Sequence, residues 1–386
     1  MTAAGSQAIV TPAAALDLLL VATSYPADRS DWHGIFIRHI ADALARRDDV
    51  QLSLWAPPGE VGPGVQRATT PDDAAWLSRL VARGGIAQLL RTRKVTGLTA
   101  AIELLRRLRR ACRRQQPGIY HINWLQNALA LPPDGKPALI TALGADMQIM
   151  RWPGVATALR RAFRDRRVAI CPNADWMVAP LHAAFGATAQ VQAVPFGIDG
   201  RWFDIRRAAE AQDEKIWLVV SRVTRDKIGP LIEWCEPLFA DGARKLHVFG
   251  PLIDAISMPS WLTFHGPASQ DDLREIWFPR AQGLISLSRH AEGRPQVMLE
   301  AMASGLPVVA SRLPAHADLL DHAQTGWLVG DAGELAAALI CLEDPATNRN
   351  IGNQARQFAQ QAFGSWDDCA RRYNDIYRHL VKAGGK

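Results

Sequence analysis

The chain has 386 residues, of which 48% are hydrophobic and 21% charged, and its formal net charge is +6. This length favours two domains of roughly 150 to 200 residues, and the composition is ordinary for a soluble globular protein. No apolar run approaches the roughly 20 residues that a membrane-spanning helix needs, and the cysteines are scattered without metal or disulfide spacing. We therefore expect a cytoplasmic protein with no transmembrane helix and no disulfide framework.

The positive charge is concentrated in the first half of the chain, since residues 1–200 carry +8 and residues 201–386 carry −2. Its densest parts are Arg91–Lys94, Leu104–Arg114 and Arg160–Arg167. A basic helix with an apolar stripe can dock on anionic lipid headgroups, which predicts peripheral contact with the cytoplasmic face of a membrane; a solvated helix face is the alternative. Nucleic acid is not an expected partner, because no aromatic residues are interleaved with these arginines.

Apolar segments alternate with helical patterns along the first half of the chain. Asp17–Ser24 is typical of a buried parallel strand, and Ile35–Ala45 has apolar residues at the three-to-four spacing of a helix. Such alternation predicts a parallel sheet covered on both faces by helices, as in a Rossmann-like domain. Further strands are expected at Val50–Trp55, Gly118–Ile122, Pro137–Thr141, Val168–Cys171 and Val191–Pro195.

A polar, charged stretch at Arg206–Lys215 marks the expected boundary between two such domains. We place the first domain at residues 1–203 and the second at residues 204–365, followed by a C-terminal segment, residues 366–386, with a helix at Trp366–Lys382. The expected fold class is therefore α/β with two Rossmann-like domains. The second domain should contain strands at Ile216–Val220, Leu246–Phe249, Leu262–His265, Gly283–Leu287 and Pro307–Ser311, and helices at Pro230–Phe239, Asp271–Ala281, Gln296–Ser304 and Ala332–Leu342.

Two cations stand at the first strand-to-helix turn of the second domain. Arg222 and Lys227 lie five positions apart, just after the strand that ends at Val220. At such a turn a helix N-terminus and cationic side chains can together bind a diphosphate through charge-assisted hydrogen bonds. Ordinary surface charge is the alternative, because an Arg and a Lys at this spacing are common.

Two glutamates, Glu292 and Glu300, lie eight positions apart around a loop and the start of a helix. Gly293 and Pro295 make the loop non-helical, and the helix that begins near Gln296 offers unpaired backbone N–H groups at its N-terminus. A carboxylate can accept hydrogen bonds from two neighbouring hydroxyls, so the pair can bind two polyols, one a pyranose and one a ribose. A capping glutamate followed by a helix-surface glutamate is the alternative.

The stretch from His290 to Ser311 resembles the donor-sugar motif of the retaining, two-domain (GT-B) glycosyltransferases of family four. The resemblance implies two Rossmann-like domains facing across a cleft, with the acceptor on the first domain, a nucleotide-sugar donor on the second, and a C-terminal helix that crosses back to the first. It implies that Glu292 holds the transferred sugar and Glu300 the ribose of the nucleotide. Arg222 and Lys227 would bind the diphosphate and act in catalysis together with Glu292. Further donor-binding residues implied are Gly34, Gly293, Arg294, Pro295, Gln296 and Val297, with a structural tether as the alternative for Arg294.

The first domain departs from the family pattern at one position. Thr141–Asp146 lines up with a family motif whose histidine is replaced here by Leu143. In the family that imidazole lies near the 6-position of the donor sugar, so leucine suggests a donor without a 6-hydroxyl, because a buried hydroxyl without a partner costs about 1 to 3 kcal/mol. The alternatives are that Asp146 or another group takes over the role, or that the enzyme is inactive. Asn123, Trp124 and Asp146 are the acceptor-binding candidates, with a packed strand-end cluster as the alternative.

The resemblance implies a retaining glycosyltransferase (EC 2.4) that moves a sugar from a nucleotide diphosphate sugar to a glycan or lipid-linked acceptor, in the assembly of a surface polysaccharide or glycolipid. No Asp-x-Asp pair occurs in the chain, so we expect no metal and no other cofactor. The absence of G-x-G-x-x-G and Walker A motifs disfavours an NAD enzyme and an NTPase. The alternatives are a non-catalytic GT-B subunit that binds a nucleotide sugar, and a GT-B epimerase or phosphorylase.

Overall fold

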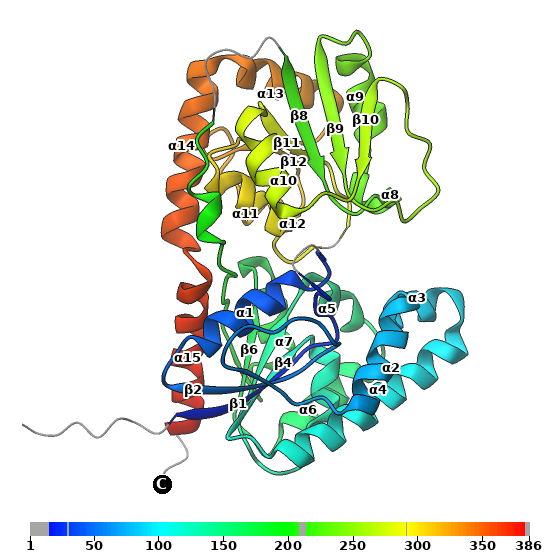
Figure 1. The fold of residues 1–386 in the computed structure, drawn as a ribbon, viewed down its shortest axis with the longest axis vertical. Coiled ribbons are helices and arrows are strands. Elements are labelled where there is room, and N and C mark those ends of the chain that lie inside the picture. Colours follow the sequence, from blue (N-terminus) through cyan, green and yellow to red (C-terminus); the bar gives the residue numbers. More distant parts are fainter. Residues whose placement is uncertain (1–14, 29–30, 208–213, 291, 383–386) are drawn as a thin grey trace, which may run out of the picture.

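Two parallel β-sheets, one in each half of the chain, form the frame of the computed structural model, which describes residues 15–28, 31–207, 214–290 and 292–382. The part with the first sheet lies below the part with the second in Figure 1. Within the described residues the strands of the first sheet follow the order β3-β2-β1-β4-β5-β6-β7, and all neighbours are parallel. They are β1 (Leu16–Val21), β2 (Val50–Trp55), β3 (Val65–Arg67), β4 (Ile119–Asn123), β5 (Ala138–Ala142), β6 (Val168–Pro172) and β7 (Gln190–Val191).

Helices cover both faces of the first sheet, because successive residues of each strand point to opposite sides. In β1, Leu18 and Leu20 belong to the core on the face of α1, whereas Leu19 and Val21 belong to the core under α4, α6 and α7. This two-sided burial explains why the strands are continuous apolar runs in the sequence. The helices are α1 (Ile35–Ala45), α2 (Pro71–Ala82), α3 (Gly85–Thr92), α4 (Lys94–Gln115), α5 (Gly144–Ile149), α6 (Val155–Phe163) and α7 (Val178–Phe185).

The second sheet follows the order β10-β9-β8-β11-β12-β13 in the described part of the chain and is also parallel. Its strands are β8 (Lys215–Val220), β9 (Arg244–Phe249), β10 (Leu262–Gly266), β11 (Gly283–Ser286), β12 (Val308–Ser311) and β13 (Trp327–Val329). The helices around it are α8 (Arg225–Ile228), α9 (Leu231–Phe239), α10 (Gln270–Asp272), α11 (Gln296–Ala303), α12 (Pro314–Ala317), α13 (Ala332–Glu343) and α14 (Pro345–Ala362). None of the helices that the structure describes combines the length and apolar character needed to cross a bilayer.

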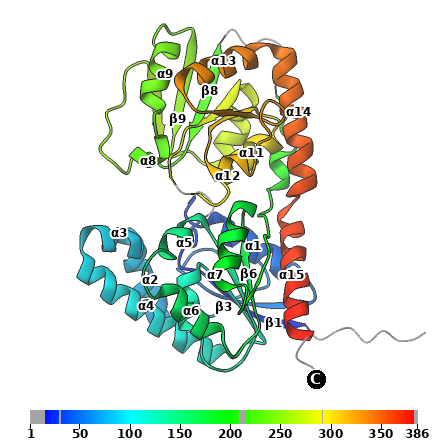
Figure 2. The same ribbon diagram turned by 180° about the vertical axis from the view of Figure 1, so that it is seen from behind.

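The last two helices run along one side of both halves (Figures 1 and 2). Helix α14 packs beside α11 of the second half, and after a turn at Gly364, which has a φ of 64°, the chain continues into α15 (Trp366–Lys382). Helix α15 packs on α1 of the first half and supplies Tyr373 and Tyr377 to the same core as Leu18. One face of the first sheet is therefore completed by the C-terminal end of the chain.

The α/β fold class with two Rossmann-like units is confirmed, and the helices at Ile35–Ala45 and Trp366–Lys382 lie where the sequence predicts them. The helix predicted over Asp271–Ala281 is present, but its geometry changes along its length. The chain there passes from α10 into a π-helical segment, Leu273–Trp277, and then a 3₁₀ turn, Phe278–Arg280, whose second residue is a proline that cannot donate an α-helical hydrogen bond. The strand predicted to end at Pro195 pairs only over Gln190–Val191, at the edge of the sheet.

Candidate active site

The loop that precedes α11 meets the first half of the chain at two glycines. A Cβ atom added at Gly144, the first residue of α5, would lie 2.3 Å from the carbonyl carbon of Glu292. A Cβ atom added at Gly293 would lie 2.3 Å from Oδ1 of Asn173, and the carbonyl of Gly293 accepts a hydrogen bond of 3.1 Å from the indole of Trp176. The two halves therefore approach so closely that only glycine fits, which fixes Glu292 at the interdomain boundary.

Glu292 forms an ion pair with Lys227, with 2.7 Å between Oε1 and Nζ, and both side chains are largely buried. Lys227 lies in α8, directly after β8, and its backbone N–H donates to the capping hydroxyl of Thr224. Burial lowers the pKa of Lys227. Burial would raise the pKa of Glu292, but the neighbouring ammonium brings that pKa below its ordinary value, so the carboxylate is ionised. The structure thus brings together two of the three residues that the sequence assigns to catalysis.

Arg222, the third of these residues, is exposed on the turn between β8 and α8. Its charge adds to the effect of burial in lowering the pKa values of Lys227 and His290, which places the three side chains in one electrostatic environment. A guanidinium at the surface and an ammonium behind it can bind the two phosphates of a diphosphate from different sides.

Four buried polar atoms on or beside this loop have no hydrogen-bond partner among the described residues: Oδ1 of Asn173, Nε of Arg294, Oε1 of Gln296 and Nε2 of His316. His316 is fully buried, and its Nδ1 lies 2.8 Å from the carbonyl oxygen of Ser311, to which it donates. Burial lowers the pKa of His316, and the nearby Glu292 opposes that effect. The imidazole is therefore neutral, with Nε2 as an acceptor. Unpaired buried atoms of this kind mark places where a polar ligand can bind.

The sequence analysis missed His316 and Asn173. Their only sequence signal is position, because Asn173 directly follows β6 and His316 follows β12, both at carboxyl ends of parallel strands. Neither residue stands in a motif that the chemistry of phosphates or sugars would single out, so only the fold brings them to the loop.

Glu300 lies on α11, one turn beyond Gln296, and is 7% exposed. Its Oε1 accepts a hydrogen bond of 3.4 Å from the side-chain amide of Gln270, the first residue of α10. Burial, together with the nearby charge of Asp199, raises the pKa of Glu300 to about 8. The carboxyl group is therefore protonated at neutral pH in the free protein, so it can both donate and accept a hydrogen bond.

The remaining predicted donor residues lie on both sides of the boundary. Pro295 caps α11, and Val297 lies in a small pocket that Lys227 also lines. Gln296 donates 3.1 Å to the carbonyl of Gly197 in the first half. Gly34 stands at the N-terminus of α1 with a φ of +66°, where an added Cβ atom would lie 2.7 Å from the backbone of Ser24 at the end of β1. Their contacts with a donor stay predictions.

Arg294 contacts protein groups on both sides of the boundary, and its contact with a donor stays a prediction. Its guanidinium donates 3.0 Å to the carbonyl of Asn173, 3.2 Å to Asp175 and 2.6 Å to Asp318, and it lies over the ring of Phe363. Asp318 also accepts the backbone N–H groups of residues 175 and 176, at 3.0 and 3.1 Å. Arg294 and Asp318 therefore tether the second half of the chain to the first, as the structural alternative proposed.

Two of the three acceptor-binding candidates make contacts within the first half of the chain, and their contact with an acceptor stays a prediction. Asn123 and Asp146 are fully buried. The Asn123 amide donates 3.0 Å to the carbonyl of Val21, and Asp146 accepts backbone N–H groups from Leu143, at 2.7 Å, and Leu125, at 3.1 Å. Burial raises the pKa of Asp146 to about 7 although these hydrogen bonds lower it. The amide nitrogen of Asn123 and both oxygens of Asp146 thus hold backbone in place, as in a packed strand-end cluster, whereas Oδ1 of Asn123 has no partner among the described residues.

Trp124 is the acceptor candidate that remains partly exposed. It adopts a φ of 65°, unusual for a residue with a side chain, and its ring meets Phe36 edge-on at 6.1 Å. Such a conformation costs free energy and persists only where the surroundings hold it, which occurs most often at functional sites. Its contact with an acceptor stays a prediction.

Comparison with known proteins finds a sequence family that is similar to part of the second half of the chain. Residues 214–344 match the family model described as glycosyl transferases group 1. N-acetyl-alpha-D-glucosaminyl L-malate synthase of Bacillus anthracis is 31% identical over 116 residues, 29% of this chain and 30% of the relative. The putative colanic acid biosynthesis glycosyltransferase WcaL of Salmonella typhimurium is 31% identical over 166 residues, 37% of this chain and 40% of the relative. The matches thus span about a third of the length of these curated relatives.

Solved structures share the whole architecture at low sequence identity. Sucrose-phosphate synthase from Thermosynechococcus elongatus has a TM-score of 0.72 and 19% identity, with 95% of this chain and 99% of that chain covered. Anabaena HepE in complex with UDP and glucose has a TM-score of 0.61 and 15% identity, with 95% and 100% covered. The fold of two facing Rossmann-like units is therefore GT-B, and within it residues 214–344 match the glycosyl transferases group 1 family model.

Proposed function

We propose that the chain is a retaining, metal-independent glycosyltransferase that moves a sugar from a nucleotide diphosphate sugar to a glycan or lipid-linked acceptor. The observation that carries this proposal is the contact of Lys227 with Glu292, which holds a cation and an ionised carboxylate 2.7 Å apart at the interdomain boundary. The ammonium can bind a diphosphate, and the carboxylate can accept hydrogen bonds from sugar hydroxyls. The setting would be surface polysaccharide or glycolipid assembly at the cytoplasmic face of a membrane.

The donor would lie on residues 204–365 and the acceptor on residues 1–203, with residues 366–386 joining the two. Titles of solved HepE structures name UDP, glucose and UDP-glucose as ligands of that protein. For this chain they support a nucleoside diphosphate sugar as the donor class. The Glu300 carboxyl, one turn into α11, would face the ribose, and its raised pKa makes it a donor as well as an acceptor to the two ribose hydroxyls.

Transfer would take place on one face of the sugar. The acceptor oxygen forms a bond to the anomeric carbon while the bond from that carbon to the diphosphate breaks, and the acceptor proton passes to the departing phosphate oxygen. Lys227 and Arg222 would stabilise the negative charge that develops there, and Glu292 would orient the sugar hydroxyls. In the free protein the Lys227 ammonium contacts Glu292, and after the donor binds it would contact both the Glu292 carboxylate and the phosphate.

The wall near the sugar 6-position would be apolar. Leu143 is partly buried against the core of the first half, and its backbone N–H is fixed by Asp146 at 2.7 Å. A 6-hydroxyl against this side chain would lose a hydrogen bond, at a cost of about 1 to 3 kcal/mol. We therefore propose a 6-deoxyhexose or a pentose as the transferred sugar.

The test is calorimetric binding of the purified protein to a panel of nucleotide sugars, with EDTA present throughout, followed by product analysis with glycan acceptors. We expect tight binding of one donor, weakened in Glu300→Ala, and transfer with retained configuration. Donor binding without transfer to any acceptor would support a non-catalytic binding subunit instead. Binding that EDTA abolishes would refute metal independence.

A further inference from the structure

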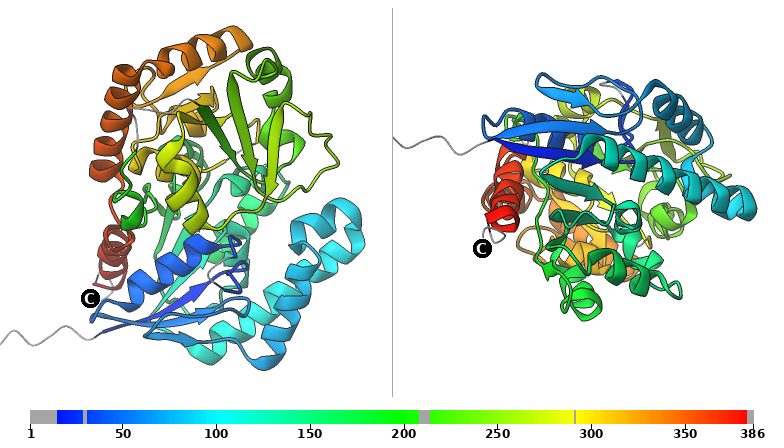
Figure 3. Two further views of the ribbon diagram at one scale, coloured as in Figure 1. Left: turned by 45° about the horizontal axis from the view of Figure 1, so that its top comes forward. Right: turned by 90° about the horizontal axis from the view of Figure 1, so that it is seen from below.

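Helices α2, α3 and α4 form an arm, residues 71–115, that extends from the side of the first domain away from α15 (Figures 1 and 3). Helices α3 and α4 cross closely, because a Cβ atom added at Gly97 would lie 2.7 Å from the backbone of Leu90. This crossing leaves the opposite side of α4 uncovered by any other described part of the chain.

The uncovered side of α4 carries aliphatic side chains in contact with solvent. Val95, Leu98 and Ile102 are 79%, 58% and 43% exposed, and their spacing of three and four residues places them on one face of the helix. Val81, at the end of α2, is 40% exposed. Aliphatic residues gathered on one helix face at this degree of exposure are unusual for a surface that meets only water, and they indicate an interaction site.

The same part of the arm is strongly basic. Between Ala74 and Ile102 the chain contains five cations and no carboxylate; the cations are Arg79, Arg83, Arg91, Arg93 and Lys94. The sequence analysis assigned membrane contact to the arginine-rich stretch at Leu104–Arg114 as well. There, however, Arg107 pairs with three carboxylates, and Arg109 and Arg114 donate to backbone carbonyls, so these guanidinium groups serve the fold.

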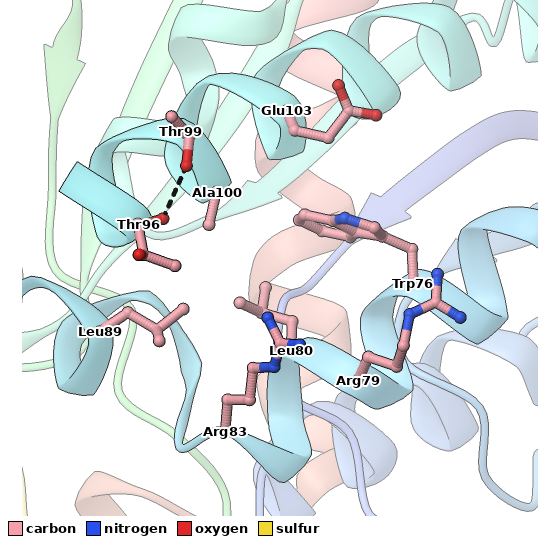
Figure 4. Close-up of a pocket in the computed structure, with 9 residues that line it drawn as sticks. All are labelled: Trp76, Arg79, Leu80, Arg83, Leu89, Thr96, Thr99, Ala100 and Glu103. Carbon is pink, nitrogen blue, oxygen red and sulfur yellow. Dashed lines mark hydrogen bonds between the residues drawn. The ribbon is translucent and has the colours of Figure 1, made fainter. Parts of the chain in front are cut away.

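The three helices of the arm also line an open pocket of about 280 Å³ (Figure 4). Trp76, Leu80 and Leu89 give it apolar walls, and Arg79 and Arg83 extend from α2 beside it. The arm thus presents aliphatic side chains on its outer face and cations along its edge, with room between its helices.

We propose that the arm docks on an anionic phospholipid bilayer, with Val95, Leu98 and Ile102 in the interfacial layer and Arg91, Arg93 and Lys94 among the headgroups. A bilayer surface matches this combination, because aliphatic burial and headgroup attraction act together on a basic amphipathic helix. A protein partner fits less well, since interface centres favour aromatic residues and disfavour lysine. A nucleic acid fits less well too, because the outer face offers no exposed ring on which bases could stack.

This inference rests on the proposed function in one respect: a docked arm would bring the transferase site to an acceptor held in the membrane. The docking itself can be measured without any transfer. Phosphatidylcholine vesicles with and without phosphatidylglycerol would be sedimented with the full chain, at low and at raised salt.

The first variants remove the two contributions separately. Removing one surface cation weakens binding to anionic membranes about fivefold, so Arg91→Gln/Arg93→Gln/Lys94→Gln should lose roughly 100-fold on phosphatidylglycerol vesicles. Val95→Ser/Leu98→Ser/Ile102→Ser should lose about tenfold or more. The matched controls are Ile340→Ser, a 63% exposed isoleucine on α13, and Arg161→Gln/Arg164→Gln in the other basic cluster; both should bind like the wild type.

A fluorophore gives a second readout that does not depend on affinity. In a Cys341→Ser background the other cysteines, Cys112, Cys171, Cys235 and Cys369, are buried, so an environment-sensitive dye can be attached at Val95→Cys or at Ile340→Cys. Anionic vesicles should shift the emission to the blue at position 95 and leave it unchanged at position 340.

Unchanged binding by both arm variants, or loss in the Arg161/Arg164 control alone, would overturn the proposal. So would arm-dependent self-association or RNA binding without vesicle binding. Nucleotide-sugar binding in solution should be the same in the arm variants as in the wild type. If the wild type binds no donor yet binds vesicles through the arm, the proposed function fails and the docking stands.

Discussion

The two sides of the interdomain boundary use their polar residues in different ways. On the second-domain side, Lys227 and Glu292 pair with each other and leave backbone groups alone. On the first-domain side, the side-chain nitrogen of Asn123 donates to a backbone carbonyl, and both oxygens of Asp146 accept from backbone N–H groups. A pair of side chains can exchange its partner for a ligand, whereas a side chain that holds backbone cannot do so without unfolding its loop. The difference supports the proposal that the second domain supplies the chemistry and the first supplies a shaped surface.

Substitutions in the ion pair of Lys227 and Glu292 should have the largest effects and test the second-domain side of this comparison. Lys227→Ala should lower kcat by about 10²- to 10³-fold, the effect of losing one group that stabilises developing charge, and Glu292→Ala should abolish measurable transfer. Each single variant also leaves a buried charge unpaired, so thermal stability should fall in both. Lys215→Ala, which breaks the 2.6 Å pair with Glu343 elsewhere in the second domain, is the matched control and should keep its transfer rate.

The double variant Lys227→Ala/Glu292→Ala separates the two roles of the pair. Its stability should recover relative to either single variant, because no buried charge is left without a partner, while its activity should stay lost. Recovery of both stability and turnover would show that the pair is structural.

Gly144→Ala tests the shape of the first-domain side. An added methyl group would lie 2.3 Å from the backbone of Glu292, so the loop must shift or the domains must separate. A displacement of about 1 Å can cost as much as 100-fold in rate, and we expect a loss of tenfold or more in kcat with donor binding to the second domain retained. Gly200→Ala, where nothing lies within 4 Å, is the control in the same assay. If kcat falls equally in Gly144→Ala and Gly200→Ala, the close approach of Gly144 to Glu292 does not explain the loss.

Because of Glu300, on the second-domain side, the free energy of unfolding should depend on pH. Its pKa is about 8 in the folded protein and lower in the unfolded chain, so the folded state binds more protons. Its contribution to stability is therefore complete below the unfolded pKa and is lost as the pH rises toward about 8, by at most about 1.4 kcal/mol per pH unit. Urea unfolding at pH values between the unfolded and the folded pKa of Glu300 should show that the free energy of unfolding of the wild type falls as the pH rises. In Glu300→Gln this fall should be smaller. The exposed Glu236→Gln should leave the decline intact.

The smallest effect is expected at Leu143. Leu143→His restores an imidazole near the proposed sugar site and should raise kcat/KM for a hexose donor relative to its 6-deoxy counterpart by about fivefold to tenfold, because one hydrogen bond contributes about 1 kcal/mol. Leu143→Met, which keeps the wall apolar, should leave that ratio unchanged. Equal use of both donors by the wild type would refute the idea before any variant is made.

Most of the frame was predictable from the sequence, because buried parallel strands and amphipathic helices leave clear patterns. Strand β2 and helix α15 begin and end where the apolar spacing places them. Three-residue strands such as β3 and β13 were not predicted, since so short a run has no period to detect. Helix α14 was also missed, although Asp344 caps it and Pro345 occupies its first turn, both of which are start signals.

The site was predictable only where a motif carried it. Glu292 and Lys227 were identified from motif and turn position, and the structure shows them in contact. Arg294 looked equally suited to a ligand, because its sequence does not reveal that Asp318 and Asp175 already surround it. His316 became visible only when the fold buried it and left Nε2 without a partner in the described part of the chain.

Helix α15 affects the order in which the two domains can fold during synthesis. The first domain is synthesised first, and domains generally fold in the order in which they leave the ribosome. Here, however, His121 in β4 is sealed by Tyr377, whose hydroxyl lies 2.5 Å from its Nδ1, and Tyr373 reaches Thr141 in β5. Until Trp366–Lys382 have emerged, that face of the sheet is covered only in part, by α1. The first domain is therefore synthesised first but can complete its folding only after α15 has been made. While the second domain is being synthesised, the nascent chain has to keep this apolar face from aggregating.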